Sequence, residues 1–584
     1  MKYTVRITAA MFAFLTGVLL LLSSCQKSFL DYTPQGALGE NVLTNEDGLN
    51  QLLIGAYAWL YGSTSNGGSD VFLGYTSPSN WLFGGGNAVD AFGAGFPVVS
   101  TNSMFDAKWR ADYDGVSMCN QVLTVAAKVT DMSKEDKENV IAQAKFLRGY
   151  FYFDLKKIFN QVPWIDETTA DYNQPNDQDI WPNIEADFKF AMDSLPETQT
   201  DDGRANKWAA AAFLAKAYLY EHKYSDAKAI FDQVIANGQT TNGLKYDLNA
   251  QFEDNFRPEK ELSSPEAVFS VAMAANVGNG SIYSANNGDM LEFPTNSPFG
   301  CCGNNDPTYD LANSYRTNAA TGLPYLDDYN DHALKNDLGV SSDEPFTPDQ
   351  GTVDPRLDWT VGRRGIPFLD WGIEPGEKWD LGRADVGPYH DKKDIYWQAT
   401  ADKYHDANSW APGSAINYRV IGFDDVLLMA AECEAQLGNL DKAEAYVNRV
   451  RNRAANPEGW LYQYKDNSNP LDGFSDVPAA HYYVKPYPPG NFTGNGKEYA
   501  LKAIYFERKL ELAMEGHRFF DLVRWGILDA TLNTTYTYLA QYNASIAGIL
   551  LTPVKNGYYP IPQSEIDIST VNGKQVLQQN PGYK

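Results

Sequence analysis

The sequence predicts a mostly α-helical protein in which paired helices form a scaffold that carries a large irregular, loop-rich lobe. Apolar residues recur at helical spacing in several segments, and two helix pairs far apart in the chain repeat a similar order of large and small residues. Between these pairs, residues 240–420 show poor helical periodicity. The chain has 584 residues, of which 43% are hydrophobic and 21% are charged, so it can bury a large core.

The N-terminus has the pattern of a secretory signal. Lys2 and Arg6 precede an apolar stretch over residues 7–22, and a Leu-Ser-Ser-Cys sequence closes it at residues 22–25. This ending resembles the lipobox of bacterial lipoproteins, in which the cysteine becomes the lipidated first residue. A transmembrane anchor is the alternative, but the mixed stretch is shorter than the ~20 apolar residues that a spanning helix needs.

These features divide the start of the chain into two segments. Residues 1–24 are predicted to be a lipoprotein signal peptide, and Cys25 is predicted to be the lipidation site. The polar residues that follow contain Pro34 and Gly36, so residues 25–45 are predicted to be a lipid-anchored tether.

Helical periodicity begins after the tether and marks an N-terminal helical region over residues 46–239. A first helix is expected over residues 46–61, where the apolar positions are Leu49, Leu52, Leu53, Ala56 and Leu60. Another helix is expected over residues 141–158 and ends before Pro163. Residues 62–103 break the pattern with frequent Gly, Ser and Asn, and the aromatic residues among them favour a functional loop over disorder.

Two helix pairs, over residues 207–237 and 423–454, have the spacing of tetratricopeptide repeats. In such a repeat, large and small residues on the first helix meet alanine and a further apolar residue on the second, so that the helices approach closely. The matching positions are Leu214, Ala215, Tyr218, Ala227 and Phe231 in one pair and Leu427, Ala431, Glu434, Ala443 and Val447 in the other. Because the pairs are distant in the chain, they do not form a simple repeat array, and residues 421–584 are expected to form a C-terminal region.

Residues 240–420 are rich in Gly, Asn, Asp and Pro and contain five of the thirteen tryptophans. Within them, the sequence Asp-Pro-Arg at residues 354–356, followed by Leu357 and Trp359, predicts a turn that leads into a short strand. Binding residues commonly lie on loops that a rigid scaffold positions. We therefore expect this insertion lobe to carry part of a ligand-binding site.

Charge and composition narrow the classes of ligand. The chain carries 47 basic and 74 acidic residues, for a formal charge of −27, and has no long basic run. Nucleic-acid binding depends on lysine and arginine that neutralise phosphates, so a nucleic-acid partner is not expected. A neutral ligand is compatible with this charge, and an aromatic content of 13% suits ligands with flat apolar faces, such as sugars.

Motifs of common catalytic and cofactor sites are absent from the sequence. It contains no GxSxG, HExxH, P-loop or GxGxxG motif, and its six histidines are scattered, so neither a cofactor nor a metal site is predicted. The cysteines other than Cys25 lack CxxC spacing and do not suggest a disulfide framework or a zinc site. The adjacent Cys301 and Cys302 either form a strained disulfide or pack in a turn, and the turn is favoured.

Three glutamates, Glu507, Glu511 and Glu515, lie four residues apart and share one helix face. One interpretation is a carboxylate pair for glycoside hydrolysis, but that chemistry needs two carboxyl groups that face each other across a sugar, about 5–9 Å apart. A structural ion-pair network is the favoured interpretation, because buried charges need partners. The arginines interleaved with the glutamates are Arg508, Arg518 and Arg524.

Sugar binding requires a flat aromatic surface and directed polar groups, because the C–H face of a sugar stacks on an aromatic ring while its hydroxyls need donors and acceptors. Trp81 is the first candidate, with Asn80 beside it and Asp70 upstream in the irregular loop. The candidates in the lobe are Arg363, Arg364, Tyr396, Trp397 and the turn residues Cys301 and Cys302. Core packing is the alternative for each tryptophan and is expected for most of them.

Motifs in a fixed order run through nearly the whole mature chain. They include Phe-Leu-Asp after Cys25, the segment AKFLRGYFYFDL, the block from residue 507 to residue 526 and an Asn-Pro-Gly-Tyr ending; the full set lies at residues 29–31, 144–155, 162–163, 203–207, 354–356, 419–432, 507–526, 560–562 and 579–583. In this order they resemble the SusD/RagB family of Bacteroidota outer-membrane lipoproteins.

The resemblance implies a SusD-like fold, with tetratricopeptide-like helix pairs around an irregular lobe, and a glycan-binding role without catalysis. It also implies a SusC-type TonB-dependent transporter as the partner that receives captured oligosaccharides. A lipid anchor in the outer membrane would then hold the protein at the cell exterior. An aromatic residue in the first long loop recurs in glycan-binding members, and Trp81 stands in that region.

Two other functions stay open at this point. Some relatives deliver peptides, and the acidic charge would then favour basic peptides. A helical glycoside hydrolase that uses Glu511 or Glu515 is the enzyme alternative. The glycan is also open, since starch-like glucans, fructans and plant hemicelluloses are all compatible with the sequence.

Overall fold

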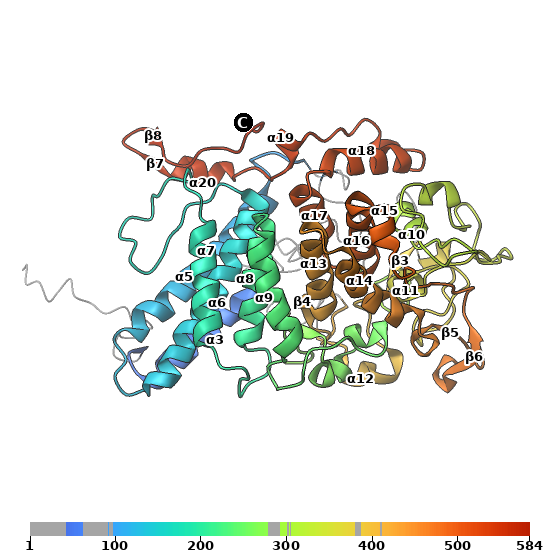
Figure 1. The fold of residues 1–584 in the computed structure, drawn as a ribbon, viewed down its shortest axis with the longest axis horizontal. Coiled ribbons are helices and arrows are strands. Elements are labelled where there is room, and N and C mark those ends of the chain that lie inside the picture. Colours follow the sequence, from blue (N-terminus) through green and yellow to red (C-terminus); the bar gives the residue numbers. More distant parts are fainter. Residues whose placement is uncertain are drawn as a thin grey trace, which may run out of the picture.

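The computed structural model describes residues 43–61, 92, 97–277, 292–300, 303, 305–379, 387–408 and 412–584. These residues are mostly helical, as the sequence predicts, with the N-terminal helices at one end of the molecule and the irregular lobe at the other (Figure 1). The predicted signal peptide, the lipidation site Cys25 and the tether up to residue 42 lie outside the described residues. Among the described residues, no helix has both the length and the apolar character needed to cross a membrane.

The N-terminal helices pack against one another in chain order. They are α3 (Glu46–Ala58), which the 3-10 turn η2 (Trp59–Tyr61) extends, α5 (Ser103–Ala126), α6 (Lys134–Phe159), α7 (Trp181–Ser194), α8 (Lys207–Tyr220) and α9 (Tyr224–Asn237). The helices expected over residues 46–61 and 141–158 are confirmed as α3 and α6, although α6 begins seven residues earlier than expected. The five apolar positions of the first prediction are all buried.

Helix α5 is not among the predicted helices, although it is one of the longest in the described part of the chain. Its N-terminus is capped by Asn102, whose side chain accepts a hydrogen bond from the backbone N–H of Met104. Trp109, Val116 and Leu123 recur at intervals of seven residues along its buried face. The helix therefore lies against α3 and α6 with one face and leaves a second, polar face at the surface.

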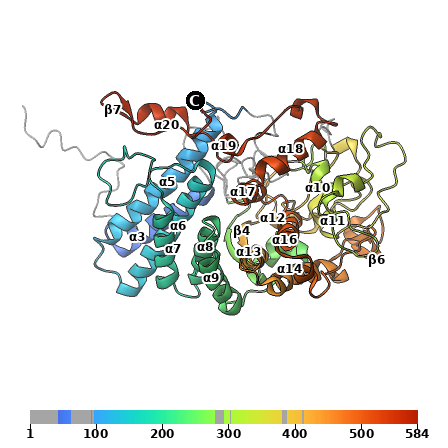
Figure 2. The same ribbon diagram turned by 45° about the horizontal axis from the view of Figure 1, so that its top comes forward.

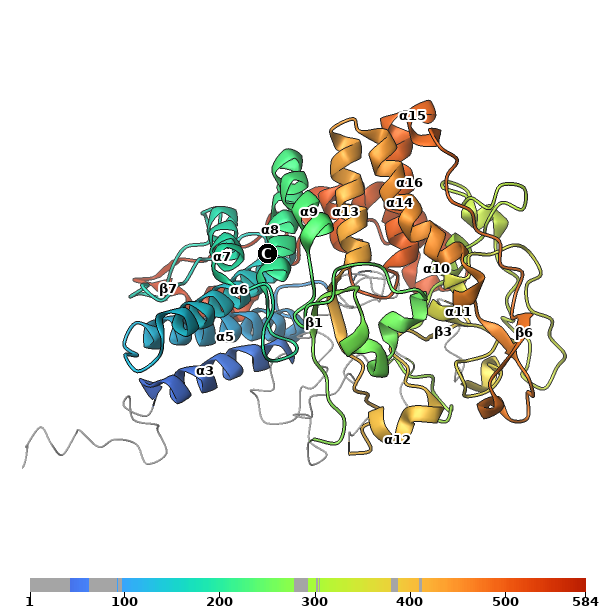
Figure 3. The same ribbon diagram turned by 60° about the horizontal axis from the view of Figure 1, so that its bottom comes forward.

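Both predicted helix pairs are present, and they are neighbours in space. The first is α8 with α9, and the second is α13 (Phe423–Gln436) with α14 (Leu440–Ala455). Helix α9 packs on α13, so the pairs form a continuous row in spite of their distance in the chain (Figure 3). Ala215, Ala227, Ala431 and Ala443 are fully buried at the helix contacts, where their small side chains allow close approach.

The remaining C-terminal helices cover the row and return to its start. They are α15 (Asn491–Asn495), α16 (Lys497–Glu511), α17 (Arg518–Arg524), α18 (Leu528–Leu539), α19 (Pro553–Asn556) and α20 (Gln563–Ile568), followed by the small hairpin of β7 (Thr570–Val571) and β8 (Lys574–Gln575). Helix α16 packs on α13 and α14. Beyond α18 the chain crosses back over the N-terminal helices, where Gln563 N donates to Ser100 O at 2.8 Å (Figures 1 and 2).

The lobe contains short elements joined by loops. Its helices and strands are β1 (Ala267–Val271), α10 (Tyr309–Ser314), α11 (Arg356–Thr360), β2 (Val361–Gly362), β3 (His390–Asp391), α12 (Ala401–Tyr404) and β4 (Tyr418–Gly422), and the hairpin of β5 (Tyr462–Tyr464) and β6 (Phe474–Pro478) packs beside it. The lobe also contains the short 3-10 segments η4 (Phe252–Phe256), η5 (Pro258–Ser263), η6 (Tyr329–His332), η7 (Glu377–Trp379) and η8 (Gln398–Thr400). Three more follow in the C-terminal region, namely η9 (Pro457–Gly459), η10 (Pro470–Asp472) and η11 (Ala544–Ile546).

Strands β1 and β4 come from opposite ends of the lobe in sequence. They pair antiparallel at its base. The prediction for residues 354–359 is wrong in one respect: the turn leads into α11, and the strand begins only at Val361. The carboxylate of Asp354 accepts a hydrogen bond from the backbone N–H of Arg356, which favours a helical turn at that point.

Candidate ligand-binding site

Several predicted ligand-binding residues lie outside the described part of the chain. They are Asp70, Asn80, Trp81, Cys301 and Cys302. Their assignment stays a prediction. Of the other cysteines, Cys119 in α5 and Cys433 in α13 are buried free thiols.

The prediction that Arg363 and Arg364 contact a ligand is contradicted by their surroundings. Arg363 is 5% exposed, and its guanidinium donates to both carboxylate oxygens of Asp358, at 2.6 and 2.9 Å. Arg364 is 7% exposed and donates to three backbone carbonyls in the loop over residues 340–344. Because these donors are already engaged inside the protein, both arginines stabilise the loops of the lobe and present no polar wall to a ligand.

Tyr396 and Trp397 also lie in the interior, with 4% and 9% of their surfaces exposed. The Tyr396 ring stacks on His405 at a centroid distance of 4.8 Å, and its other aromatic neighbours are Phe293, Phe299 and Trp371. Trp397 packs between Trp359 and Phe474, and the guanidinium of Arg257 lies 4.5 Å from its ring centre. The alternative of core packing is therefore correct for these two residues, and the prediction of a second aromatic wall is wrong.

The glutamates of the C-terminal motif are buried and paired, as the network interpretation predicts. Arg356 is bound to Glu507 at 2.8 Å and to Glu511 at 2.6 Å. Glu515 is bound to Arg419 at 3.0 Å and to Lys393 at 2.7 Å. With these carboxylates held by cations inside the protein, the helix does not offer a substrate the facing carboxyl pair that glycoside hydrolysis needs.

The cations of this network are not the expected ones. Arg508 binds Asp425 and Asp521, and Arg524 binds Glu432 and Asp521. The guanidinium of Arg518 lies beside the ring of Trp525. Glu507 and Glu511 instead receive Arg356, Arg451 and Arg453, which come from the lobe and from α14.

A cluster of three buried carboxylates within this network has the geometry of a metal site. One oxygen each of Glu266, Asp424 and Glu511 lies within 4.8 Å of the others. However, Arg453 binds Glu266 at 3.0 Å and also Glu511, and Arg419 binds Asp424 at 3.0 Å. Burial, together with the neighbouring carboxylates, raises the pKa of Glu266 to about 7. Two guanidinium groups thus supply the positive charge that a metal ion would otherwise provide.

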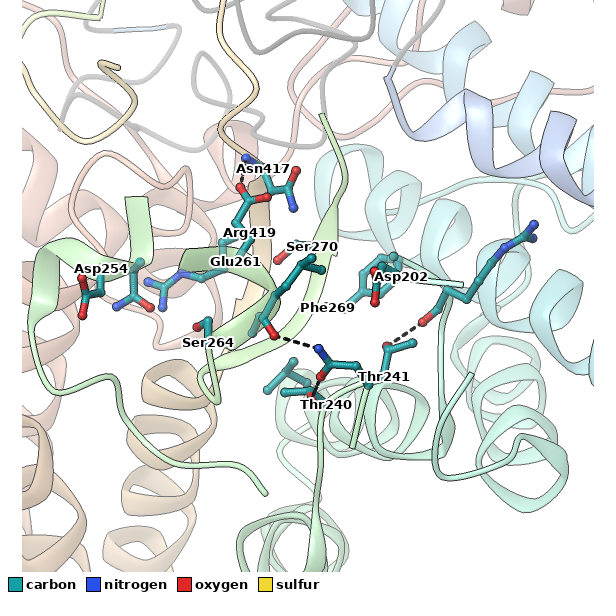
Figure 4. A pocket seen from close by; sticks show the side chains of 17 residues that line it. Asp202, Thr240, Thr241, Asp254, Glu261, Ser264, Phe269, Ser270, Asn417 and Arg419 are labelled. Carbon is teal, nitrogen blue, oxygen red and sulfur yellow. Dashed lines mark hydrogen bonds between the residues drawn. The ribbon is translucent and has the colours of Figure 1, made fainter. Parts of the chain in front are cut away.

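A small cleft opens at the base of the lobe, between the β1–β4 ribbon and the loops that flank α8 and α9 (Figure 4). Asn417 N donates to the carboxylate of Glu261 at 2.7 Å, and the Asn242 amide donates to Leu262 O at 2.8 Å. Burial raises the pKa of Glu261 to about 8. The cleft has a volume of about 100 Å³, enough for several water molecules but well below the roughly 300–1,000 Å³ of ligand pockets.

A larger cavity lies against the surface of α5, which we name the α5 groove. It is bounded by α5, the loop over residues 163–174, the segment from Glu565 to Leu577, and the side chains of Leu43 and Leu52. Its volume is about 810 Å³, within the range of small-molecule sites. Of the predicted ligand-binding residues that the structure describes, none lines this groove.

The comparisons with known proteins agree with these features of the fold. Residues 265–583 match a family model described as the SusD family. The chain belongs to the SusD family. In addition, residues 28–219 match a model described as "Starch-binding associating with outer membrane".

Relatives of this SusD-family chain cover most of its length. SusD-like protein P25 of Formosa agariphila is 26% identical over 573 residues, which cover 94% of each chain. SusD-like protein P2 of the same organism is 24% identical over 442 residues, which cover 74% of this chain and 73% of the relative.

Solved structures share the fold. A SusD superfamily protein from Bacteroides vulgatus has a TM-score of 0.62 and 20% identity, over 92% of this chain and 99% of that one. Surface glycan-binding protein A from Bacteroides thetaiotaomicron, solved in complex with laminarihexaose, has a TM-score of 0.58 and 18% identity, also over 92% and 99%.

The α5 groove of this SusD-family chain was not predicted, because α5 itself was not predicted. The signal was nonetheless in the sequence. Polar residues recur every three or four positions along one face of the helix, at Arg110, Asp114, Ser117, Gln121 and Thr124. A polar helix face is common at protein surfaces, so the walls supplied by distant segments are what make this face part of a cavity.

Proposed function

We propose that this SusD-family protein is a lipoprotein of the outer membrane, anchored through Cys25 and facing the cell exterior, that captures oligosaccharides or polysaccharides. It delivers them to a SusC-type TonB-dependent transporter. The main support is the family match together with the likeness to a surface glycan-binding protein that was solved with laminarihexaose, which extends over 99% of that chain.

Binding without catalysis is part of the proposal. Glu511 and Glu515, the carboxylates of the enzyme alternative, are 0% and 6% exposed and are held by Arg356, Arg419 and Lys393. A glycoside hydrolase needs one carboxyl that can give up a proton to the leaving oxygen and another that can reach the sugar. Buried carboxylates paired with cations meet neither requirement.

Calorimetric titration of the mature chain, residues 26–584, with starch, laminarin, levan, inulin, xylan, mannan and pectic polysaccharides tests the function. The same samples are assayed for released reducing sugar. We expect heat with a neutral glycan and no hydrolysis. Release of sugar would contradict the proposal in favour of an enzyme. Silence with every glycan, together with salt-sensitive binding of basic peptides, would contradict it in favour of peptide capture.

Replacement of Trp81 tests the predicted aromatic platform. Trp81→Ala should lose most of the affinity for the glycan, by at least about tenfold, because the stacking surface is removed, while the melting temperature stays nearly unchanged. Trp397→Ala is the matched control: its buried ring should cost about 3–5 kcal/mol of stability. A large loss of thermal stability in Trp81→Ala would place that residue in the core and overturn its assignment.

A further inference from the structure

The α5 groove is a preformed cavity, because hydrogen bonds hold each of its walls in place. On one side, the Tyr113 hydroxyl donates to Pro163 O at 2.7 Å, and the Asn120 amide donates to Ile165 O at 3.1 Å. These two bonds join the loop over residues 163–174 directly to α5. On the other side, Arg110 donates to the Glu565 carboxylate at 3.0 Å, which holds α20 against the same helix.

The two walls are also joined to each other. The buried Asn176, which is 1% exposed, donates to the backbone carbonyl of Gln578 at 2.8 Å and accepts from its backbone N–H at 2.8 Å. These two hydrogen bonds between the Asn176 side chain and the Gln578 backbone tie the loop wall to the C-terminal wall. A ligand would therefore enter a site whose shape is already fixed, which reduces the entropic cost of binding.

The groove combines exposed apolar surface with free polar groups. Tyr172 on the loop wall is 74% exposed, and Ile568 on the α20 wall is 70% exposed. Ser117 and Gln121 also line the groove from exposed positions of α5, and their side chains make no hydrogen bond with other described residues. An aromatic face with hydroxyl and amide groups nearby is the combination that recognises a sugar ring and its hydroxyls.

The charges around the groove disfavour an anionic ligand. Four carboxylates border it, from Asp114, Asp166, Glu167 and Glu565, against the guanidinium of Arg110 on its rim. The carboxylate of Glu167 also forms an ion pair with Arg148 of α6, at 2.5 Å. The surplus of negative charge repels anions, whereas carboxylates accept hydrogen bonds from neutral hydroxyls well.

We propose that the α5 groove is a second carbohydrate site, which binds a neutral, hydroxyl-rich oligosaccharide by stacking on Tyr172 and by hydrogen bonds to Ser117 and Gln121. This inference rests on the proposed function, because it takes the ligand class to be glycan. It adds a binding surface that does not depend on Trp81 and that comes from α5, the loop after α6 and the C-terminal segment. A second site would raise the apparent affinity for a long glycan chain through effective concentration.

The test titrates neutral hexasaccharides, namely laminarihexaose, maltohexaose and xylohexaose, with hexagalacturonate as the anionic comparison. Tyr172→Ala, made in the Trp81→Ala background, should weaken the remaining binding on the order of tenfold, and Tyr172→Phe should restore it because the stacking face returns. Ser117→Trp fills the groove and should remove the remaining binding. Gln121→Ala should weaken it several-fold, whereas Gln233→Ala, at an exposed position of α9, is the matched control and should change nothing.

Hydrogen exchange on the wild-type protein provides a readout that is independent of the variants. A bound hexasaccharide should slow exchange in residues 163–174 and along the exposed face of α5. Wild-type affinity in all groove variants, with no change in exchange there, would overturn the second site while the proposed function stands. Tighter binding of hexagalacturonate than of the neutral sugars would overturn the charge argument. Silence of the wild-type protein with every sugar would contradict the proposed function and the second site together.

Discussion

The N-terminal helices and the junction between the lobe and the C-terminal helices bury their interiors by different means. In the first region, Phe213 of α8 lies among Phe146, Phe188 and Phe269, with ring centroids 5.4, 5.4 and 6.0 Å away. In the second, the fully buried Arg356 lies among the carboxylates of Asp354, Glu507 and Glu511. Aromatic contacts fill much of the first interior, although it also buries the ion pairs of Lys108 with Asp154 and of Arg148 with Asp187. The second is mainly an array of ion pairs.

This difference shows how each region is specified. Apolar side chains can pack against any apolar neighbour of suitable shape, so the helices need only present the right face. A buried charge must meet a particular partner, because an unpaired ion in the interior costs several kcal/mol. The ion pairs therefore determine which loop of the lobe lies on α16, in a region where regular hydrogen-bonded structure is short.

The largest effect should follow from breaking the charged junction. Arg356→Ala leaves three buried carboxylates without their shared cation, so it should lower the free energy of unfolding by about 5 kcal/mol. Arg449→Ala is the matched control, because its ion pair with Asp247 is at the surface and should contribute less than about 1 kcal/mol. Denaturant titration measures both; equal losses would show that the junction does not depend on its ion pairs.

A somewhat smaller effect is expected in the apolar region. Phe213→Ala removes a ring that contacts several aromatic neighbours and leaves a cavity, at a cost of about 4 kcal/mol in unfolding free energy. Phe190→Ala, on α7, should cost less than about 1 kcal/mol because that ring is 36% exposed. If the two variants unfolded at the same denaturant concentration, the N-terminal core would not depend on this aromatic cluster.

The smallest effect concerns pH and the buried carboxylate of Asp425 in α13, which pairs with Lys216 of α8 and Arg508 of α16. Burial alone raises the pKa of the Asp425 carboxyl, but the ammonium of Lys216 and the guanidinium of Arg508 lower that pKa well below its usual range. The resulting stabilisation is present above about pH 4, where the unfolded carboxyl is also ionised, and is lost as the pH falls further. Asp425 should therefore account for about 1 kcal/mol of the stability lost between about pH 5 and about pH 3.

Asp425→Asn should flatten this part of the stability profile, although it lowers stability at neutral pH. Phe213→Ala should keep the wild-type slope, since it changes no titrating group. Chemical denaturation at a series of pH values measures both slopes. A steeper acid loss in Phe213→Ala than in the wild-type protein would remove the distinction between the two interiors.

Local patterns account for the parts of the fold that the sequence predicted. The apolar spacing of α3, α6 and the two helix pairs is written in consecutive residues, so each helix and its buried face can be found without knowledge of the rest. Helix α5 shows the limit of this approach, since no helix was predicted over residues 104–140 and its buried face was not identified. For the candidate site, residue type suggested Arg363 and Trp397 as ligand contacts, but their burial depends on Asp358 and on Trp359, Phe474 and Arg257.

The sequence by itself determined the helix pairs, the family motifs and the need for cations around Glu507, Glu511 and Glu515. Only the tertiary structure decided which cations those are. Arg508 follows Glu507 directly in α16, and neighbouring residues of a helix do not face each other, so Arg508 turns to Asp425 and Asp521. Arg356 reaches Glu511 across 155 residues of chain, a distance over which no local pattern carries information. The α5 groove likewise exists only where the fold brings α5, the loop after α6 and the C-terminal segment together.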